Sequence, residues 1–447
     1  MENPKSMKKS ESLTVVVVSL ASPKPGSGGP DGFAYILLRA LAEYKHEGLS
    51  VFSWTVNTCR LVPVETTIDV ERYFCGPRRP SRKHQAAEVV RELFSRHSRY
   101  GFIGHGIVEW GREWTLAQNV RRMRGAFAEF VREHPRILMH AQGPEAAYAA
   151  TQLCAPHPEV QLVHTEHSKG GFREIEQWSG PHIKSWRVAR TIQKYYARSF
   201  ARAERIVFPS RGAYSLFCEY SPLPDGVRKK VEIVYTGLCL PPAPPIPARS
   251  DIFRMFSIAE HFPEKGLDRL LRALGRLPRE VCRNWRLEVA GGFTNLTPEL
   301  TFLRNSLNLQ SKVDFLGRLD HQATLEKLAA ADLFVSFPRV IVFDLALLEA
   351  MAYGKPIITS SLTGNIEALG EDYPLYVSTE EDMSKAIYQC MNGDIPLEEI
   401  SRTNCTRLKE RFTDQEMATA YMELYKICFA VTGHRLPAAA EVEVSHG

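Results

Sequence analysis

The chain has 447 residues, of which 44% are hydrophobic and 24% are charged, and its formal net charge is +5. This length allows two or three domains of an ordinary globular protein, and no apolar run approaches the roughly 20 residues that span a bilayer. The nine cysteines form no CxxC pair, so we expect free thiols in the cytoplasm and no bound metal. We also expect no nucleic-acid partner.

The first half begins with an apolar run, Leu13–Leu20, behind Lys8 and Lys9. We interpret it as a buried strand and not as a signal peptide, because it is short and no clear cleavage site follows. The glycine-rich loop Gly26–Gly32 and an apolar helix from Phe33 come next. Strand, glycine loop and helix are typical of phosphate sites, but the spacing is not G-x-G-x-x-G. A tight turn beside a cleft is therefore an equally good interpretation.

Short apolar runs then alternate with helical patterns, which predicts a doubly wound parallel sheet. The predicted strands are Leu49–Val56, Arg136–His140, Val160–Val163, Arg205–Phe208 and Val231–Val234. In such sheets ligands bind beyond the carboxyl ends of the strands, where three loops lie in this chain: Gly26–Gly32, His140–Pro144 and His164–Gly171. His167 in the third loop is a candidate catalytic residue, although a structural histidine is an equally good interpretation.

Basic residues cluster locally in this half. They lie before and on a predicted helix, Trp114–His134, and on the segment Lys184–Arg205, where aromatic residues are interleaved. The clusters favour an anionic substrate or an anionic membrane surface. The alternative, a solvated helix face with aromatic residues turned inward, stays open. The residues concerned include Arg78, Arg79, Arg82, Lys83, Arg121, Arg122 and Arg124, with Trp186, Tyr195, Tyr196 and Phe200 as the aromatic ones.

A proline-rich connector, Leu240–Pro247, separates two halves of the chain. It is stiff and extended and cannot continue a helix or a sheet, so we place a domain boundary there. The α/β alternation restarts after it, and Asp414–Phe429 is predicted to form a long final helix. The predicted strands of this half include Phe253–Ile258, Trp285–Ala290 and Val313–Leu316.

The stretch Ala331–Leu369 reads as strand, loop, helix, strand, loop, helix. Both helices begin at the same edge of the predicted sheet, where each presents unpaired N–H groups and a partial positive charge. Such an edge favours an anion, and Glu349 on the first helix can accept a hydrogen bond from a hydroxyl of the same ligand. A nucleoside diphosphate carries both groups, so the stretch predicts a nucleotide site.

Six motifs of the second half occur in an order that is typical of one enzyme family. They are PEKGLD (263–268), VAGG (289–292), VDFLG (313–317), ADLFV (331–335), LEAMAYGKPI (348–357) and GNIE (364–367). Through them the second half resembles the donor domain of family-4 retaining glycosyltransferases of the GT-B fold. The first half resembles the family more loosely, through its glycine loop, His140-Ala-Gln-Gly143 and Thr165-Glu-His167.

The resemblance implies an α/β protein of the GT-B fold. Two Rossmann-like, doubly wound parallel-sheet domains would face a central cleft, and a C-terminal helix would cross back to the N-terminal domain. The predicted division is an acceptor-binding domain at residues 1–240, a linker at 241–250, a donor-binding domain at 251–413, a crossover helix at 414–430 and a flexible tail at 431–447.

The resemblance also implies roles for single residues. Lys265 would neutralise the donor diphosphate and assist the leaving group, His167 would lie near the anomeric centre, and both count as catalytic. Glu349 would bind the donor ribose. The other donor-binding residues would be Gly28 and Gly29 beneath the donor, Gly317, Arg318 and Leu319 at the nucleobase, Phe343, Asp344 and Leu345 at the sugar, and Thr363, Gly364 and Asn365 at the phosphates.

Two positions depart from the family pattern. Ile341 stands where the family commonly has a glutamate that contacts the donor sugar, and Glu260 stands where it commonly has an arginine at the diphosphate. The first change suits a deoxy or modified sugar, or marks lost activity. The second should weaken donor binding unless another cation compensates, and His261, Arg318 and Arg339 are the candidates.

The function implied is retaining transfer of a hexosyl group from a nucleotide-diphosphate sugar to the hydroxyl of an unknown acceptor, without metal or other cofactor. One alternative is a catalytically degenerate GT-B subunit that binds a glycan or stabilises a partner transferase. A GT-B epimerase or phosphorylase is another, but the motif order does not favour it. We expect a cytoplasmic protein, with peripheral membrane contact through the basic N-domain surface as a further hypothesis.

Overall fold

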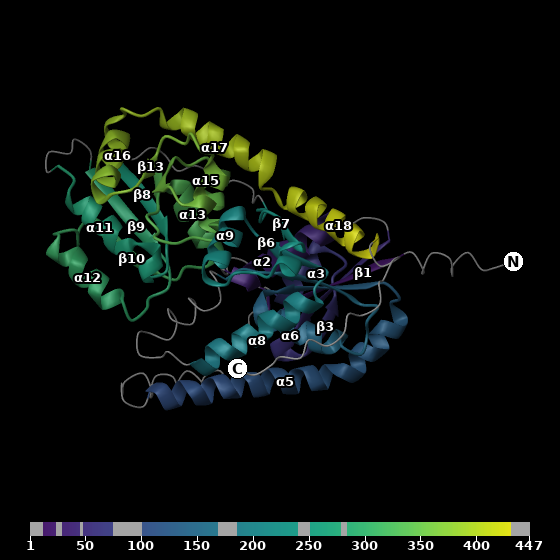
Figure 1. Ribbon diagram of the computed structural model, residues 1–447. Helices are drawn as coiled ribbons and strands as arrows, with labels where there is room; N and C mark the ends of the chain where they lie inside the picture. Colours follow the sequence, from purple (N-terminus) through teal and green to yellow (C-terminus); the bar gives the residue numbers. More distant parts are fainter. Residues whose placement is uncertain are drawn as a thin grey trace.

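The computed structural model describes residues 12–23, 29–44, 48–74, 101–168, 186–239, 251–278 and 284–430 (Figure 1). Several predictions concern residues outside this part of the chain. They are the roles of Gly28, the basic residues 78–83, the linker at 241–250 and the tail at 431–447.

The N-terminal half forms a seven-stranded sheet in the order β3-β2-β1-β4-β5-β6-β7. All neighbouring strands are parallel except β2 and β3, which are antiparallel. The strands are β1 (Leu13–Ser19), β2 (Leu49–Thr55), β3 (Arg60–Pro63), β4 (Ile137–Gln142), β5 (Gln161–Thr165), β6 (Arg205–Phe208) and β7 (Val231–Ile233).

Helices cover both faces of this sheet because interior strands such as β1 are apolar on both sides. Val15 and Val17 of β1 pack into one hydrophobic cluster, whereas Val16 and Val18 pack into the cluster on the opposite face. The helices of this half are α2 (Gly29–Glu43), α3 (Thr67–Phe74), α5 (Gly101–Glu133), α6 (Gly143–Cys154), α8 (Trp186–Arg202), α9 (Arg211–Tyr220) and α10 (Asp225–Arg228), with a short 3₁₀ turn, η1 (Val56–Thr58).

Two helix boundaries differ clearly from their predictions. Helix α2 begins at Gly29, inside the predicted glycine loop Gly26–Gly32, and not at Phe33. The helix predicted from Trp114 begins at Gly101 in the structure, as the first part of the 33-residue α5. Its early turns contain four glycines, which have low helix propensity and therefore conceal the start in the sequence. No helix in the described part of the chain is long and apolar enough to cross a membrane.

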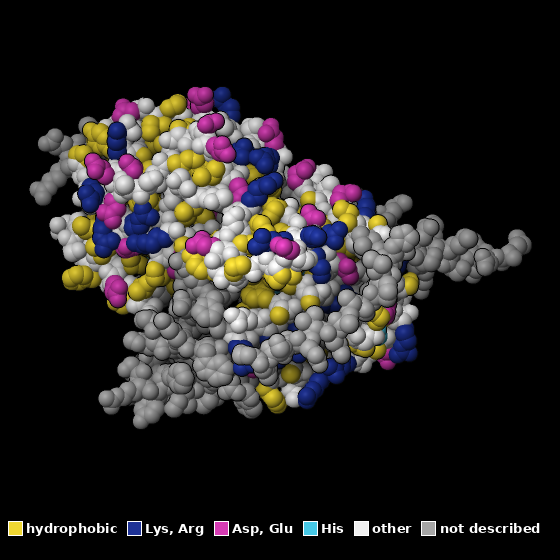
Figure 2. Space-filling view, in the orientation of Figure 1, with side chains coloured by type: hydrophobic (Ala, Val, Ile, Leu, Met, Phe, Trp, Pro, Cys, Tyr) yellow, Lys and Arg dark blue, Asp and Glu magenta, His cyan; other side chains and the backbone are white. Residues whose placement is uncertain are grey.

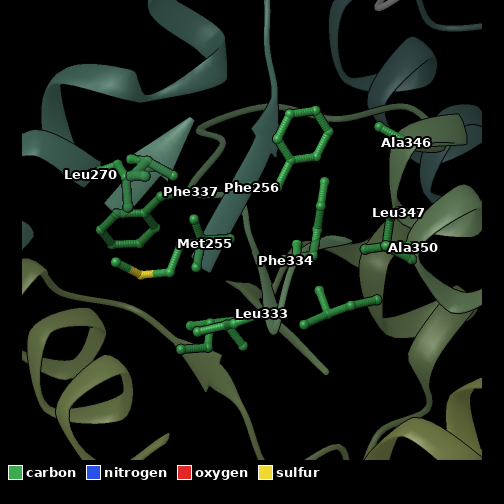
Figure 3. Packing of buried hydrophobic residues seen from close by; sticks show 14 of the residues in the cluster. Met255, Phe256, Leu270, Leu333, Phe334, Phe337, Ala346, Leu347 and Ala350 are labelled. Carbon is green, nitrogen blue, oxygen red and sulfur yellow. The ribbon is translucent and has the colours of Figure 1, made fainter. Parts of the chain in front are cut away.

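The second half forms a six-stranded, fully parallel sheet in the order β10-β9-β8-β11-β12-β13. Figure 3 shows Met255 and Phe256 of the central strand β8 beside Leu333 and Phe334 of β11, with Leu347 of α14 near them in the same core. The strands are β8 (Ile252–Ile258), β9 (Asn284–Ala290), β10 (Val313–Gly317), β11 (Leu333–Val335), β12 (Ile357–Ser360) and β13 (Tyr376–Val377). The helices are α11 (Leu267–Gly275), α12 (Thr297–Ser306), α13 (His321–Ala330), α14 (Leu345–Ala352), α15 (Thr363–Leu369), α16 (Glu380–Asn392) and α17 (Leu397–Arg411), with a 3₁₀ turn, η2 (Pro263–Lys265).

The last helix, α18 (Asp414–Ala430), returns to the N-terminal half and packs on α2 (Figure 1). Directly before this helix, Thr413 pairs with Leu238 as a parallel bridge, so the start of α18 lies beside the last described residues of the N-terminal half. Tyr425 on this helix lies 2.7 Å, hydroxyl oxygen to Nδ1, from the buried His140. The protein therefore has two doubly wound domains and a C-terminal helix that crosses back, as the sequence predicts.

Candidate donor site

The order of the second sheet points to one position for a ligand. Strands β9 and β10 lie on one side of β8, and β11, β12 and β13 lie on the other. In open α/β sheets ligands bind at the carboxyl edge where the winding direction changes, which is between β8 and β11 here. The loops that follow these two strands meet there, because the N–H of Arg339 donates to the carbonyl of Glu264 at 2.7 Å.

Lys265 lies in the loop after β8, at the end of η2. Its side chain is half-buried and makes no hydrogen bond or ion pair with any residue that the structure describes. A partly desolvated ammonium group without a counter-ion is well suited to bind an anion such as a diphosphate. The structure thus places the predicted diphosphate-binding lysine at the predicted edge.

Arg339 and Arg318, the two candidate replacements for the missing arginine, are both paired. Arg339 donates both guanidinium ends to Asp268, each at 2.7 Å, and Arg318 donates to Glu260 at 2.5 Å. Burial would raise the pKa of the Asp268 carboxyl, but Arg339 and Arg272 bring it below its ordinary value. The ion pair with Arg318 in turn neutralises the charge of Glu260 locally.

His261, the third candidate, is fully buried. Burial lowers the pKa of its imidazole, and Nδ1 lies 2.9 Å from Oγ1 of Thr297. A buried neutral imidazole cannot compensate for a lost guanidinium group. Among the described residues of these loops, Lys265 is consequently the cation that remains free for a diphosphate.

The start of α14 faces the same edge. Asp344 is its N-cap, but the Asp344 side chain makes no capping bond. The N–H groups of Leu347 and Leu348 bond to the Asp344 carbonyl, whereas those of Leu345 and Ala346 have no partner among the described residues. Free N–H groups at a helix start attract anionic or polar ligand atoms. The ring of Phe343 is partly buried and lies near the rings of Tyr235 and Phe412.

Glu349 lies one turn further along α14 and is 14% exposed. Its Oε1 lies 2.9 Å from Nε2 of His321, the first residue of α13. His321 holds one carboxylate oxygen and leaves the other able to accept a hydroxyl. The sequence did not reveal this partner, because His321 lies outside the six motifs and is 28 residues away from Glu349 in the chain.

The start of α15 is more enclosed by neighbouring residues than the start of α14. Asn365 is fully buried and its amide donates to Thr359 and to the carbonyl of Ser360, so its side chain cannot reach a ligand. A Cβ on Gly364 would lie 2.6 Å from the Val342 carbonyl oxygen, so the loop after β11 covers this glycine. The prediction that Thr363, Gly364 and Asn365 bind phosphates therefore stays a prediction for the backbone alone.

The other domain contributes His167, which follows β5. Its Nε2 lies 2.9 Å from Oε1 of Gln142, and its ring centroid lies 4.7 Å from that of Phe33. Burial lowers the pKa of His167 to about 4. The imidazole is therefore neutral near pH 7, with Nε2 as the donor to Gln142. Gln142 ends β4 and precedes α6, so the histidine lies at the carboxyl edge of its own sheet.

Two family sequence models match the chain in succession. The model described as Glycosyltransferase Family 4 matches residues 28–240, and the model described as Glycosyl transferases group 1 matches residues 245–406. The chain belongs to family 4 of the glycosyltransferases. Part of this family-4 chain, 111 residues or 25% of it, is 32% identical to the lipopolysaccharide glucosyltransferase WaaG of Escherichia coli. That match covers 28% of WaaG, and the matched segments span 28% to 42% of the curated relatives.

Solved structures with the same fold cover nearly the whole family-4 chain. Sucrose-phosphate synthase from Thermosynechococcus elongatus is 16% identical, with a TM-score of 0.63 over 94% of this chain and 100% of that chain. Anabaena HepE in complex with UDP-glucose is 15% identical, with a TM-score of 0.59 over 93% of this chain and 100% of that chain. At these identities the likeness shows a common GT-B fold.

The family-4 chain also has a contact between its domains that the motifs did not reveal. The carboxylate of Glu367 accepts from the N–H groups of Arg211 and Gly212 at 2.9 and 2.6 Å, and from the hydroxyl of Tyr235 at 2.8 Å. A carboxylate at the start of α9 is stabilised by the free N–H groups and the helix dipole. Ser210 adds a hydrogen bond to the Val342 carbonyl at 2.8 Å. Glu367 belongs to the GNIE motif, but only the fold brings it to Arg211, Gly212 and Tyr235.

Because the pKa of His167 is lowered in the folded chain, we expect the free energy of unfolding to depend on pH. The unfolded chain takes up a proton on this histidine near its ordinary pKa of about 6.5, whereas the folded chain does so only near pH 4. Between these values the unfolded state binds more protons, so the free energy of unfolding falls as pH falls, by about 1 kcal/mol per pH unit from this group. Denaturant unfolding from pH 7 to pH 4 should show this slope, and it should be smaller in His167→Gln. Titration of the His167 ring by NMR with a midpoint near 6.5 would contradict the assignment.

Proposed function

We propose that this family-4 chain is a retaining glycosyltransferase that moves a hexosyl group from a nucleotide-diphosphate sugar to an acceptor hydroxyl. The observation that carries the proposal is the combination of an unpaired Lys265 with the open N–H groups of Leu345 and Ala346 and the carboxylate of Glu349 at one sheet edge. Cation and amides match a diphosphate, and the carboxylate matches a ribose hydroxyl.

The chemistry follows from these groups. As the bond between sugar and diphosphate breaks, negative charge develops on the leaving oxygen, and Lys265 together with the α14 helix start stabilises it. The acceptor hydroxyl attacks the same face of the oxocarbenium-like sugar and passes its proton to the departing phosphate. A neutral His167 donates its one N–H to Gln142, so it can accept a hydrogen bond at Nδ1 from a hydroxyl near the sugar without adding a positive charge there. This pathway needs no metal, and no group of three or more metal-ligating side chains occurs among the described residues.

The alternative function is a catalytically degenerate subunit, and Ile341 is the observation that favours it. A methyl of Ile341 lies 3.5 Å from where a Cβ on Gly364 would be, so the side chain packs against α15. An apolar residue at this position removes a hydroxyl ligand for the donor sugar. Glu260, the second departure, gives the alternative less support because its charge is matched by Arg318.

A donor screen with purified protein tests both functions. UDP-glucose is the first candidate, since WaaG is a glucosyltransferase and HepE was solved with this molecule. The screen should also contain adenosine, guanosine and thymidine diphosphate sugars, with binding followed by calorimetry and turnover by release of the nucleoside diphosphate. We expect saturable binding and slow hydrolysis of at least one donor. Binding without hydrolysis or transfer would favour the degenerate subunit, and binding of none would reject the donor site.

We further propose that the basic surface of the N-terminal domain makes an electrostatic contact with anionic membranes, where an amphiphilic acceptor would be found. Arg121, Arg122 and Arg124 are exposed on α5, and Figure 2 shows basic side chains exposed along this edge of the molecule. Tyr195, Tyr196 and Phe200 of α8 are buried, so these rings are turned inward and cannot insert into a bilayer. Binding to anionic vesicles should therefore weaken steeply with salt, and salt-independent binding would reject this contact.

A further inference from the structure

An exposed aromatic ring lies beside the candidate donor site, on the loop after β9. Phe293 is 58% exposed. Its ring lies over the end of β10, because a Cβ on Gly317 would be 3.4 Å from Cζ of Phe293. The ring centroid also lies 5.3 Å from that of the buried His261. Phe293 is thus held on one side by Gly317 and His261 while much of its surface faces solvent.

The second planar group is the guanidinium of Arg318. Arg318 directly follows β10, and its side chain reaches the loop after β9. A Cβ on Gly292 would lie 3.3 Å from Nη2 of Arg318 and 3.3 Å from Oε1 of Glu260. The Arg318 side chain is 77% exposed and its guanidinium group is tied to Glu260 at 2.5 Å. Glu260, one of the two residues that depart from the family pattern, therefore fixes the position of the Arg318 guanidinium group.

These two groups lie on the side of the site where a nucleobase would be. Glu260 belongs to the loop after β8 that also carries Lys265, the proposed diphosphate ligand. His321, which begins the helix after β10, holds Glu349, the proposed ribose ligand. A nucleotide that spans Lys265 and Glu349 would extend its base toward the ends of β9 and β10, where Phe293 and Arg318 lie.

We propose that Phe293 stacks on the nucleobase of the donor, and that Glu260 is a positioning residue that holds Arg318 against the same base. This inference rests on the proposed function, because it assigns the base-binding end of that site. Aromatic rings and guanidinium planes stack on any base, so these residues contribute affinity for the nucleoside whichever base the donor carries.

The test compares ligands with and without a base. Phe293→Ala should weaken binding of uridine and adenosine diphosphates by about 10-fold, the loss typical of one stacked base, and leave the affinity for inorganic pyrophosphate unchanged. Phe293→Leu keeps apolar packing on Gly317 but lacks an aromatic face, so it should also bind nucleotides more weakly than wild type. Phe302→Ala is the matched control, since Phe302 lies on α12 in the same domain and is 76% exposed. It should bind all three ligands as the wild type does.

The role of Glu260 is tested by a double-mutant cycle. Glu260→Gln should weaken nucleotide binding in the wild-type background and have no effect when Arg318→Ala is already present. Additive losses would show that Glu260 does not act through Arg318. If the wild type binds nucleotides and Phe293→Ala binds them equally well, or loses pyrophosphate binding in parallel, the stacking role is overturned. If the wild type binds no nucleoside diphosphate at all, the proposed function itself fails.

Discussion

Lys265→Ala is expected to lower kcat/KM for donor hydrolysis or transfer by about 100- to 1,000-fold, the loss typical when one group that stabilises a developing anion is removed. The effect should be large because the neighbouring cations are engaged elsewhere. Arg339 is bound to Asp268 and Arg318 to Glu260. Neither can replace the missing ammonium group without losing its own ion pair. Steady-state kinetics with the donor found in the screen would measure the loss.

Two further variants serve as controls for Lys265→Ala. Lys385→Ala removes an exposed lysine of α16 in the same domain and should leave the kinetics unchanged. Lys265→Arg keeps the charge but changes its geometry, so it should retain part of the activity. Equal activity of Lys265→Ala and wild type would show that the diphosphate does not bind at Lys265.

Gly266→Ala is expected to lower the free energy of unfolding by about 2–4 kcal/mol, from strain and overpacking together. Gly266 has φ of +66°, and a Cβ there would lie 1.9 Å from the carbonyl oxygen of Phe337. The loops after β8 and β11 would have to separate to accept one methyl group. Because Lys265 is the preceding residue, the same change should also weaken nucleotide binding.

Gly393 provides the matched control for this variant. It has φ of +80°, but nothing lies within 4 Å of the Cβ position. Gly393→Ala therefore carries only the backbone cost of a left-handed conformation, about 1 kcal/mol, and should not affect nucleotide binding. Chemical denaturation of both variants separates the two contributions. An equal loss of stability in both variants would mean that the loops after β8 and β11 move apart without a measurable loss of free energy.

The local sequence predicted the architecture well where it depends on patterns along the chain. The continuous run Val15–Val18 predicted a strand buried on both faces, and its valines do alternate between two hydrophobic clusters. The helix predicted at Asp414–Phe429 is found as α18, Asp414–Ala430. Hydrophobic periodicity records which faces are buried, so it survives in the sequence. The predicted start of α5 was wrong because the glycines in its first turns weaken the helical pattern.

Pairings between distant charged residues were not predictable in this way. The sequence placed Glu260 beside a predicted diphosphate site and indicated an unfavourable charge, but it could not show that Arg318 neutralises it. Likewise, the contact of His321 with Glu349 and the contact of Glu367 with the start of α9 join residues that lie far apart in the sequence. Such contacts depend on loop paths and side-chain rotamers, which leave no periodic pattern in the sequence.

What the sequence determined by itself was the family and its two-sheet architecture, because motif order and apolar periodicity are properties of the chain. What only the tertiary structure decided was which groups at the sheet edge remain free for a ligand. Lys265 and the first N–H groups of α14 are free to bind an anion, whereas the charges of Arg339 and Arg318 are paired with carboxylates and the Asn365 amide is hydrogen-bonded. A charge is available to a ligand only when no nearer partner satisfies it, and that depends on distances in space.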